Sequence, residues 1–526
     1  MMRRLLKPAA VLGLVLALTA GIETFVTTKA ARSNDRIPNL SAACATDNPY
    51  LVTPCYRGIM KDALNSTFEK RAPALIMFQD TPNDVPEYKL ADFYQLGTVW
   101  GLAYNAAEPA IYAAAFTKRQ LPYGPGGPGA IYRLDLKTLA VTTFATIPNA
   151  GQDHHVGSLA LPDKDMVPWV GRMGLGDLDL NAAGTELYAM NLLDKKIYRL
   201  AVPSGQILGS FDHGAAAEPW ARDARPFALA FHDGLLYHGV VSSAATSGKR
   251  NELVAYVYAS DPDGGRMRRV AEIPLDYLRG RLKLGPGSRN VNVRWQVWTD
   301  KDPPRARGTF PFAMNPQPIL TDIEFDAANA MILGFRDRTT DTTAQSLVYK
   351  YNGAREEQLA MGVGDILRGT LNGSTWDFAA APEYYQDDVP YLGDESTTGG
   401  LAEFQRTNEI VAAAIGMQDF NDPPVSPAEG LIWFDNATGE KWRREQTCSV
   451  TYMRLLDPAT SVASFKASDR VERALAYGDI PLPPPYKPIA SAPVAVRGPG
   501  SMGDVEVLCP LETVGTGTAT PALSSP

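Results

Sequence analysis

Short runs of alternating apolar and polar residues, separated by small or polar turn residues, recur along the chain from Gly97 onwards. Residues 97–116 read GTVWGLAYNAAEPAIYAAAF, and residues 129–144 continue as GAIYRLDLKTLAVTTF. A period of two places successive side chains on opposite faces of a strand. The pattern therefore predicts short β-strands joined by tight turns.

The same layout returns several times. Residues 174–211, GLGDLDLNAAGTELYAMNLLDKKIYRLAVPSGQILGSF, supply an opening strand, two strands that each carry a Tyr, and a closing strand. Later copies open with RPFALAF at 225–231, PILTDIEF at 318–325 and GGLAEF at 399–404. We expect the copy that opens with PILTDIEF to continue through SLVYKYNGAREEQLA at 346–360. Units of four strands over roughly 40 to 50 residues are typical of β-propellers, in which blades bury their faces against one another.

One further opening strand, GSMGDVEVLC at 500–509, has no regular unit behind it. A circular array produces such a strand when its first and last blades share strands from both chain ends. We therefore predict an all-β fold, a β-propeller of six or seven blades with long insertions between blades, notably at 266–320 and 361–398. A β-sandwich is the alternative, and it accounts less well for the repeated pair of Tyr-bearing strands.

The predicted domain boundaries follow from these units. Residues 1–30 begin with Arg3, Arg4 and Lys7 ahead of an apolar run, which is the layout of a secretory signal peptide. Residues 31–96 form an N-terminal extension with a possible short helix and a disulfide loop, residues 97–510 the propeller, and residues 511–526 a disordered tail. We expect export, a location outside the cell or on its surface, and no membrane span in the mature chain.

The charge balance of the sequence argues against one class of binding partner. Acidic residues exceed basic ones and give a formal net charge of -8. Because nucleic-acid affinity depends on Lys and Arg neutralising phosphates, the balance argues against a nucleic-acid partner.

The four cysteines fit an oxidising compartment, and three pairings are possible. We favour Cys44 with Cys55, which closes a short loop, and Cys448 with Cys509, which ties the last strand to a neighbour. Free buried thiols are the alternative. The chain lacks the closely spaced Cys and His residues of a zinc site.

Three opening strands carry paired acids, so the two carboxylates of each strand share a face. The pairs are Asp177 and Asp179, Asp322 and Glu324, and Asp504 and Glu506. If these strands are innermost, the acids converge near the central channel, where Ca²⁺ would offset their repulsion. The competing interpretation is that each acid accepts hydrogen bonds from a neighbouring blade and locks the two together. The other openings lack the pair, which predicts a lopsided site.

Other motifs give weaker evidence for a functional site. His154 and His155 are adjacent, so on an extended segment they point apart and cannot easily chelate one ion. VRWQVW at 293–298 could line a ligand surface or pack an insertion onto the body. The chain has no GxSxG, HExxH or GxxxxGK[ST] motif, so the sequence identifies no catalytic residue.

Taken in order, the motifs GPGGPGAIYRLDL, VGRMGLGDLDLNAAGTELYAMNL, LTDIEFDAANAMILGFRDR, GLIWFDNATG and GSMGDVEVLC resemble the propeller-like N-terminal region of bacterial secreted or surface proteins that carry SdrD B-type repeats. The resemblance runs from about Gly97 to Cys509. It implies a surface location and an interaction role, and it transfers no catalytic residue. The chain departs from the family pattern because no B-type repeats follow Cys509.

Two functions therefore compete. The first is a non-catalytic binding module for an extracellular protein or polysaccharide. The second is a Ca²⁺-dependent propeller hydrolase of the lactonase or esterase type, with Asp177, Asp322 and Asp504 as metal ligands. The sequence does not determine the oligomeric state.

Overall fold

The structure is a computed structural model of the whole chain. It describes residues 37–56, 73–79, 87–155, 163–282, 291–301, 312–313, 315–343, 348–351, 354–357, 359–360, 364–378, 384–385, 387, 395–415, 429–442, 453–455, 487–488 and 502–510. The predicted signal peptide, the helix expected near residues 57–71 and the C-terminal tail lie outside these residues.

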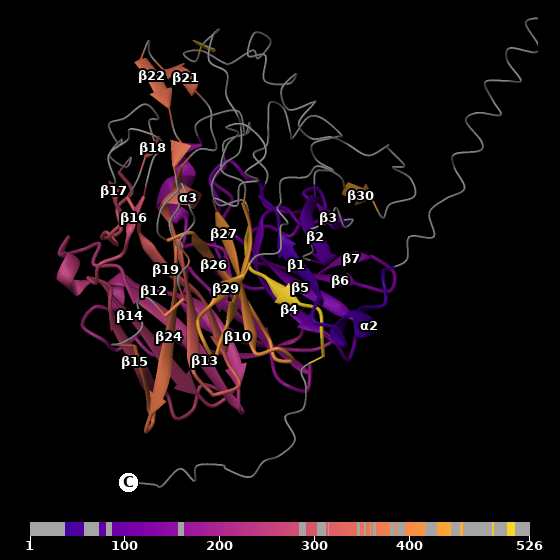
Figure 1. Cartoon of the computed structure of the whole chain (residues 1–526). Coiled ribbons are helices and arrows are strands. Elements are labelled where there is room, and N and C mark those ends of the chain that lie inside the picture. The colour runs from indigo at the N-terminus through magenta and orange to yellow at the C-terminus, as the bar shows by residue number, and fades with distance from the viewer. Residues whose placement is uncertain are drawn as a thin grey trace, which may run out of the picture.

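Six sheets, which we number blades 1 to 6, make up most of the described chain (Figure 1). Blade 1 consists of β4 (Val99–Asn105), β5 (Ala110–Ala115), β6 (Ala130–Asp135) and β7 (Val141–Thr146). Blade 2 consists of β8 (Leu175–Leu180), β9 (Glu186–Asn191), β10 (Lys196–Ala201) and β11 (Ile207–Asp212). Blade 3 consists of β12 (Ala224–His232), β13 (Leu235–Ser242), β14 (Val254–Ser260) and β15 (Arg268–Pro274).

The remaining blades come from the second half of the chain and from both of its ends. Blade 4 consists of β19 (Pro318–Phe325), β20 (Met331–Asp337), β24 (Asp365–Asn372) and β25 (Thr375–Asp377). Blade 5 consists of β26 (Thr397–Phe404), β27 (Glu409–Ile415), β28 (Glu429–Asp435) and β29 (Lys441–Trp442). Blade 6 has the order β30-β3-β2-β1-β32, with β30 (Met453–Leu455), β3 (Glu87–Asp92), β2 (Pro73–Gln79), β1 (Tyr50–Pro54) and β32 (Glu506–Val507).

The blades close into a ring. Their innermost strands contact one another in the order β4, β8, β12, β19, β26 and β32, and β32 contacts β4 again. Radial closure leaves only short, protected sheet edges at the inner strands. The predicted all-β propeller is therefore confirmed, with six blades among the described residues.

Blade 6 joins the two ends of the chain. Strand β32, near the C-terminus, pairs antiparallel with β1, so that Leu51 lies opposite Val507 (Figure 1). The isolated opening strand noted in the sequence is thus the inner strand of the closing blade. We predicted from the sequence that the ring starts at Gly97. The ring instead begins upstream of that residue, at β1.

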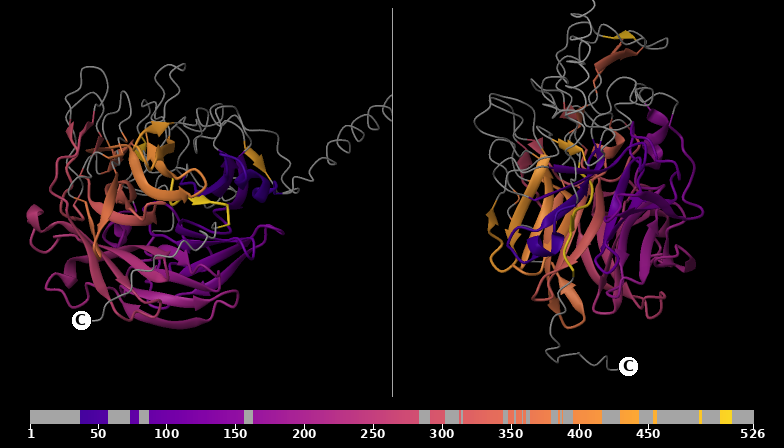
Figure 2. Two further views of the ribbon diagram at one scale, coloured as in Figure 1. Left: turned by 60° about the horizontal axis from the view of Figure 1, so that its bottom comes forward. Right: turned by 90° about the vertical axis from the view of Figure 1, so that its right-hand side faces the viewer.

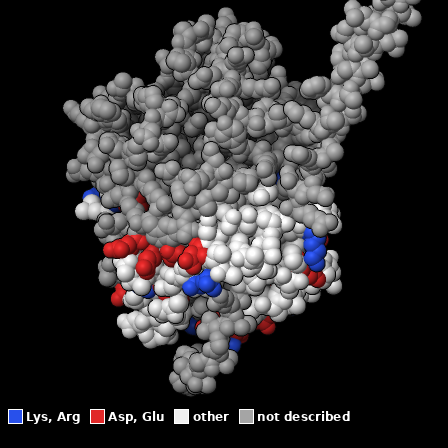
Figure 3. Space-filling model, turned by 45° about the vertical axis from the view of Figure 1, so that its right-hand side comes forward, with Lys and Arg blue, Asp and Glu red and all other residues white. Residues whose placement is uncertain are grey.

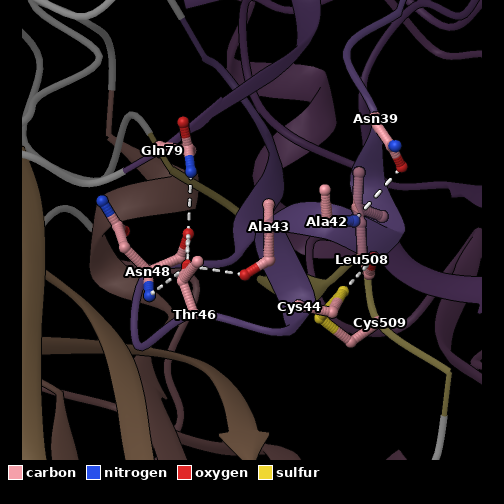
Figure 4. The surroundings of a disulfide bond; sticks show 9 residues. All are labelled: Asn39, Ala42, Ala43, Cys44, Thr46, Asn48, Gln79, Leu508 and Cys509. Atoms are coloured by element: carbon pink, nitrogen blue, oxygen red, sulfur yellow. Dashed lines mark hydrogen bonds between the residues drawn. A yellow bond between two sulfur atoms is a disulfide. The ribbon is translucent and has the colours of Figure 1, made fainter.

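A disulfide reinforces this closure. Cys44, at the end of α2 (Leu40–Cys44), is bonded to Cys509 just after β32 (Figure 4). The predicted pairings of Cys44 with Cys55 and of Cys448 with Cys509 are therefore wrong. Cys55 is buried and does not take part in this disulfide, and Cys448 lies outside the described residues. The reason is that ring closure brings together residues 465 positions apart, which loop length alone does not reveal.

Burial follows the radial position of each strand. Every residue of β5 is buried, whereas β7 and β11, the outer strands of blades 1 and 2, are mostly exposed. The core lies between facing blades: Tyr112 of blade 1, for example, belongs to the same apolar cluster as Leu178 and Leu187 of blade 2. Each blade therefore depends on its neighbours for burial.

The fourth unit differs from its expected layout. Strands β21 (Val348–Tyr351) and β22 (Ala354–Glu357) were predicted to belong to it, but they pair with β31 (Lys487–Pro488) in a separate small sheet. Strands β24 and β25, in a predicted insertion, complete blade 4 instead. The β21–β22 and β24–β25 hairpins have similar patterns of apolar and polar residues, so the sequence did not distinguish them. Only the pairing of β24 with β20 shows which hairpin completes blade 4.

The remaining elements are short (Figures 1 and 2). Two-stranded sheets join β16 (Arg281–Leu282) with β17 (Val291–Asn292), and β18 (Phe312–Ala313) with β23 (Leu359–Ala360). The short helices are α3 (Thr339–Thr342), η2 (Lys164–Trp169), η3 (Ala221–Asp223) and η4 (Arg250–Glu252). No helix in the described part of the chain is long and apolar enough to span a membrane.

Candidate functional site

The six acids predicted from the sequence lie on the innermost strands of three blades. Asp177 and Asp179 belong to β8 and Asp322 and Glu324 to β19, while Asp504 and Glu506 lie at β32. Their carboxylates are close enough to interact across the ring axis. Burial, and then the charge of Asp322, raise the pKa values of Asp177 and Asp504 well above their usual range.

Four of these acids bridge neighbouring blades through backbone amides, and one of them, Asp179, accepts through Oδ2 from the N–H of Phe231 in blade 3. Asp177 Oδ2 accepts a hydrogen bond from the N–H of Leu229 at 3.0 Å, which links blade 2 to blade 3. Asp322 Oδ2 accepts from Leu401 at 2.7 Å, which links blade 4 to blade 5. Asp504 Oδ2 accepts from Leu102 at 2.9 Å, which links blade 6 to blade 1.

The second oxygen of these carboxylates is also engaged. Asp177 Oδ1 accepts from the amide of Leu178, and Asp504 Oδ1 accepts from the amide of Val505, each at 2.9 Å. A carboxylate that accepts two amide hydrogen bonds in a buried position is held rigidly. These contacts are those of the blade-locking interpretation.

A recurrent β-bulge supplies the free amides. In blades 1 to 5 the inner strand shifts register against its partner at the same place, just before Leu102 in blade 1 and just before Leu229 in blade 3. A bulge takes residues out of the ladder and leaves their backbone groups available to others. Leu102, Leu229 and Leu401 are the first residues to rejoin the ladder after the bulge, and their amides bind the acid of the preceding blade.

Glycine at the bulge lets the strands approach closely. A Cβ added to Gly101 would lie 2.7 Å from Asp177 Cα, and one added to Gly400 would lie 2.3 Å from the carbonyl oxygen of Gly503. Such distances leave no space for a side chain. The Gly-rich approach to the acidic strands is thus a packing requirement.

The acids alternate around the ring. Blades 2, 4 and 6 provide carboxylates, and blades 3, 5 and 1 provide the amides that bind them. The bridging residues Asp177, Asp322 and Asp504 are therefore evenly spaced around the ring, and the lopsided metal site expected from the sequence stays a prediction. The openings without an acid pair are the receiving partners, a role that becomes visible only when ring order is known.

A second layer of acids lies two residues further along the inner strands, and it includes one residue that the sequence analysis missed. Asp179, Glu324 and Glu506 were predicted, and Glu403 of β26 joins them. Burial raises the pKa of Glu403 to about 8 and that of Asp179 to about 7. Aligning GLAEF with TDIEF would have identified Glu403, because both place an acid at the fourth position.

The geometry does not form a metal cage. Among the described residues, no group of three or more His, Cys, Asp or Glu side chains is arranged to hold a metal ion. The oxygens of Asp177 and Asp504 already accept amide hydrogen bonds. Ca²⁺ binding by the six acids stays a prediction.

The adjacent histidines point apart, as their spacing suggested. His155 Nδ1 lies 2.6 Å from Asp153 Oδ1, and its Nε2 lies 3.2 Å from the carbonyl oxygen of Lys118. His154 instead stacks on Trp169, with ring centroids 4.8 Å apart. Both contacts serve packing and positioning.

A network of buried charged residues lies near the axis, and no sequence motif predicted it. Arg336 donates to both oxygens of Asp341, stacks 4.5 Å from the ring of Trp100, and donates to the carbonyl oxygens of Thr398 and Met502. Lys118 also pairs with Asp341. Although burial acts to raise the pKa of Asp341, these two cations hold it below its usual value. The network joins blades 1, 4 and 5 to the segment that leads into β32.

Comparison with known proteins gives distant relatives. No family model matches the chain. Colossin-A of Dictyostelium discoideum is 27% identical over 308 residues, which cover 56% of this chain and 3% of that protein. Colossin-D of the same organism is 27% identical over 387 residues, 68% of this chain and 38% of that protein. The chain thus spans well under half the length of the relatives it matches.

Solved structures overlap only loosely. The β-propeller domain of Cps50 (Swd1) from Myceliophteria thermophila has 8% identity and a TM-score of 0.31, over 70% of this chain and 82% of that one. A suggested 6-phosphogluconolactonase of Bacteroides uniformis has 10% identity and a TM-score of 0.34, over 76% of this chain and 97% of that one. The sheet order and the ring of inner strands therefore carry the description of the fold.

Proposed function

We propose that the protein is an exported β-propeller that binds an extracellular protein or polysaccharide without turning it over. The observation that carries this proposal is the bond between Cys44 and Cys509, which fastens the closing blade covalently. Disulfides form and persist in oxidising compartments, so this closure supports export.

The axial acids support binding over catalysis. Asp177, Asp322 and Asp504 accept amide hydrogen bonds from the next blade, so they hold the ring together. A hydrolase that used them as metal ligands would need several acids gathered around one ion, and among the described residues no group of three or more His, Cys, Asp or Glu side chains is so arranged. The partner surface is then expected on the outside of the ring, and one outer face has a broad stretch without charged side chains (Figure 3).

Export is tested with the full chain and with a variant that lacks residues 2–30, both produced in a secreting host. We expect the full chain in the medium with a Cys44–Cys509 cross-linked peptide in non-reducing mass spectrometry. The shortened variant should stay inside the cell. Retention of the full chain, or reduced cysteines in the secreted protein, would contradict the proposal.

Catalysis is tested separately, by assaying lactone and aryl-ester hydrolysis with and without chelator. We expect no turnover in either condition. Hydrolysis that chelation abolishes and Ca²⁺ restores would replace the binding proposal with the hydrolase hypothesis, while leaving the export test unaffected.

A further inference from the structure

A cluster of cations surrounds one buried indole between blades 2, 3 and 4. The guanidinium carbons of Arg338, Arg225 and Arg172 lie 4.7, 5.4 and 5.7 Å from the ring centre of Trp298. Trp298 itself is 2% exposed. Cation–π contacts of this kind involve one cation in most cases, and three on one ring bring like charges together.

Lys195 extends the cluster. This residue lies in the turn between β9 and β10, and its Nζ donates to the carbonyl oxygens of Ala221 and Arg222 at 3.0 and 3.4 Å. Arg225 Nη1 donates to the same oxygen of Arg222 at 3.0 Å. The ammonium group and a guanidinium group therefore lie side by side at one end of the cluster.

The acids in contact with these four cations are fewer than the cations. Asp300 pairs with both Arg172 and Arg338, each at 2.8 Å. Asp223 lies 3.8 Å from Arg225, but its two oxygens already accept from Thr246. Lys195 forms no ion pair within the described part of the chain. The cluster thus holds an excess of positive charge in a protein whose net charge is -8.

Several donors in the cluster are unused. The Nε atoms of Arg172 and Arg225 are buried and make no hydrogen bond to described residues. The side chain of Arg225 is 10% exposed and that of Arg172 is 24% exposed, so the cluster runs from the interior to the surface. Buried donors without partners are costly, and native structures rarely keep them unless something else satisfies them.

We propose that Lys195, Arg225 and Arg172 form an oxyanion-binding site that receives a carboxylate, sulfate or phosphate group of an acidic ligand. Guanidinium groups suit such groups because their paired N–H donors match two oxygens at once. The cations repel one another, and this repulsion adds to the effect of burial on their pKa values. Burial and the charge of Arg225 lower the pKa of the Lys195 amine to about 8, and burial and the charge of Arg172 lower that of Arg225 to about 10. A bound anion would relieve both effects.

The test measures the melting temperature of the full chain at pH 7 and constant ionic strength, in increasing millimolar sulfate, phosphate or glucuronate, with chloride as reference. Preferential binding to the folded state raises the melting temperature. We expect at least one oxyanion to do so at concentrations where chloride has no effect. The comparison of the three anions identifies which group the site prefers.

Two variants separate the site from general salt effects. Lys195→Gln removes the ammonium group and should raise the anion concentration needed for half of the effect by about tenfold or more. Lys196→Gln is the matched control, because Lys196 is its exposed neighbour, 42% exposed, and pairs with Asp212 instead. An equal response in both variants, or no response to any of the three anions in the unaltered protein, would overturn the proposal.

Discussion

Single side chains at the ring axis combine two roles that are separable by substitution. Asp177 satisfies two buried amides, and it also places a carboxyl group near Asp322. The first role needs an oxygen acceptor, whereas the second depends on charge. Substitutions that keep the acceptor and remove the charge therefore distinguish blade locking from cation binding.

We predict that Asp177→Ala lowers the free energy of unfolding by about 2 to 4 kcal/mol, because two buried amides lose their acceptor. Asp177→Asn should cost about half as much, since its single amide oxygen can still accept one of the two hydrogen bonds. Urea denaturation followed by circular dichroism measures both. Equal losses in the two variants would contradict the role of the remaining acceptor oxygen in locking the blades.

Protonation of the axial acids gives stability a specific pH dependence. Burial raises the pKa of Glu403 to about 8, so the folded state binds a proton that the unfolded state has released above its ordinary pKa. The free energy of unfolding contributed by this group therefore falls as the pH rises from about 4.3 through 8. Below that window both states are protonated and the contribution is constant.

Glu403→Gln should remove this contribution. We expect the melting temperatures of the variant and the unaltered protein to be similar at pH 4.5, and the variant to melt at a higher temperature at pH 9. Glu440→Gln, at an exposed turn position, is the control and should show no such divergence. A constant difference between Glu403→Gln and the unaltered protein at all pH values would contradict the raised pKa.

At the scale of single elements, the bulged inner strand is the feature that builds the ring. In blades 1, 3 and 5 an amide beside the bulge binds the acid of the neighbouring blade, and glycine at the bulges of blades 1 and 5 permits close approach. Gly209 in the outer strand β11 provides a contrast, because a Cβ added there would meet no atom within 4 Å. Packing thus requires glycine at the inner-strand bulge and not at this outer-strand position.

We predict that Gly400→Ala destabilises the protein by about 1 to 3 kcal/mol or more, because its Cβ would overlap the backbone of Gly503, just before β32. Gly209→Ala should leave the free energy of unfolding within about 0.5 kcal/mol of the unaltered value, as surface substitutions usually do. Chemical denaturation of the pair checks the difference. Comparable effects at the two positions would mean that β26 and β32 are less tightly packed than described.

At the scale of the whole molecule, closure depends on one short strand and one covalent bond. Strand β32 pairs with β1 through Leu51 and Val52, and Cys509 follows it directly. A cross-link between residues so far apart restricts the unfolded chain strongly in the loop-entropy model. The disulfide should therefore contribute substantially to the stability of the ring.

The double variant Cys44→Ser/Cys509→Ser should lose about 2 to 5 kcal/mol of stability relative to the oxidised protein. A reductant should lower the melting temperature of the unaltered protein towards that of the variant and leave the variant unchanged. Non-reducing thermal melts with and without reductant provide the measurement. An equal shift in both proteins would point to another reducible bond.

Strand positions and the shared Gly-Asp opening could be read from the sequence, because alternation, turns and paired acids are properties of neighbouring residues. These local signals predicted the propeller, the isolated closing strand and six of the axial acids, but they missed Glu403. They failed for β24 and β25, because two hairpins alternated equally well and only pairing with β20 distinguished them.

The tertiary structure alone decided which distant residues meet. The Cys44–Cys509 bond, the alternation of acid-bearing and amide-bearing blades, and the cations around Trp298 all join residues that are far apart in the chain. Ring closure brings such residues together, and closure depends on how many units the chain makes and on which strands complete them. A local pattern determines that a strand forms and which face is polar, whereas only the closed ring determines what that polar face contacts.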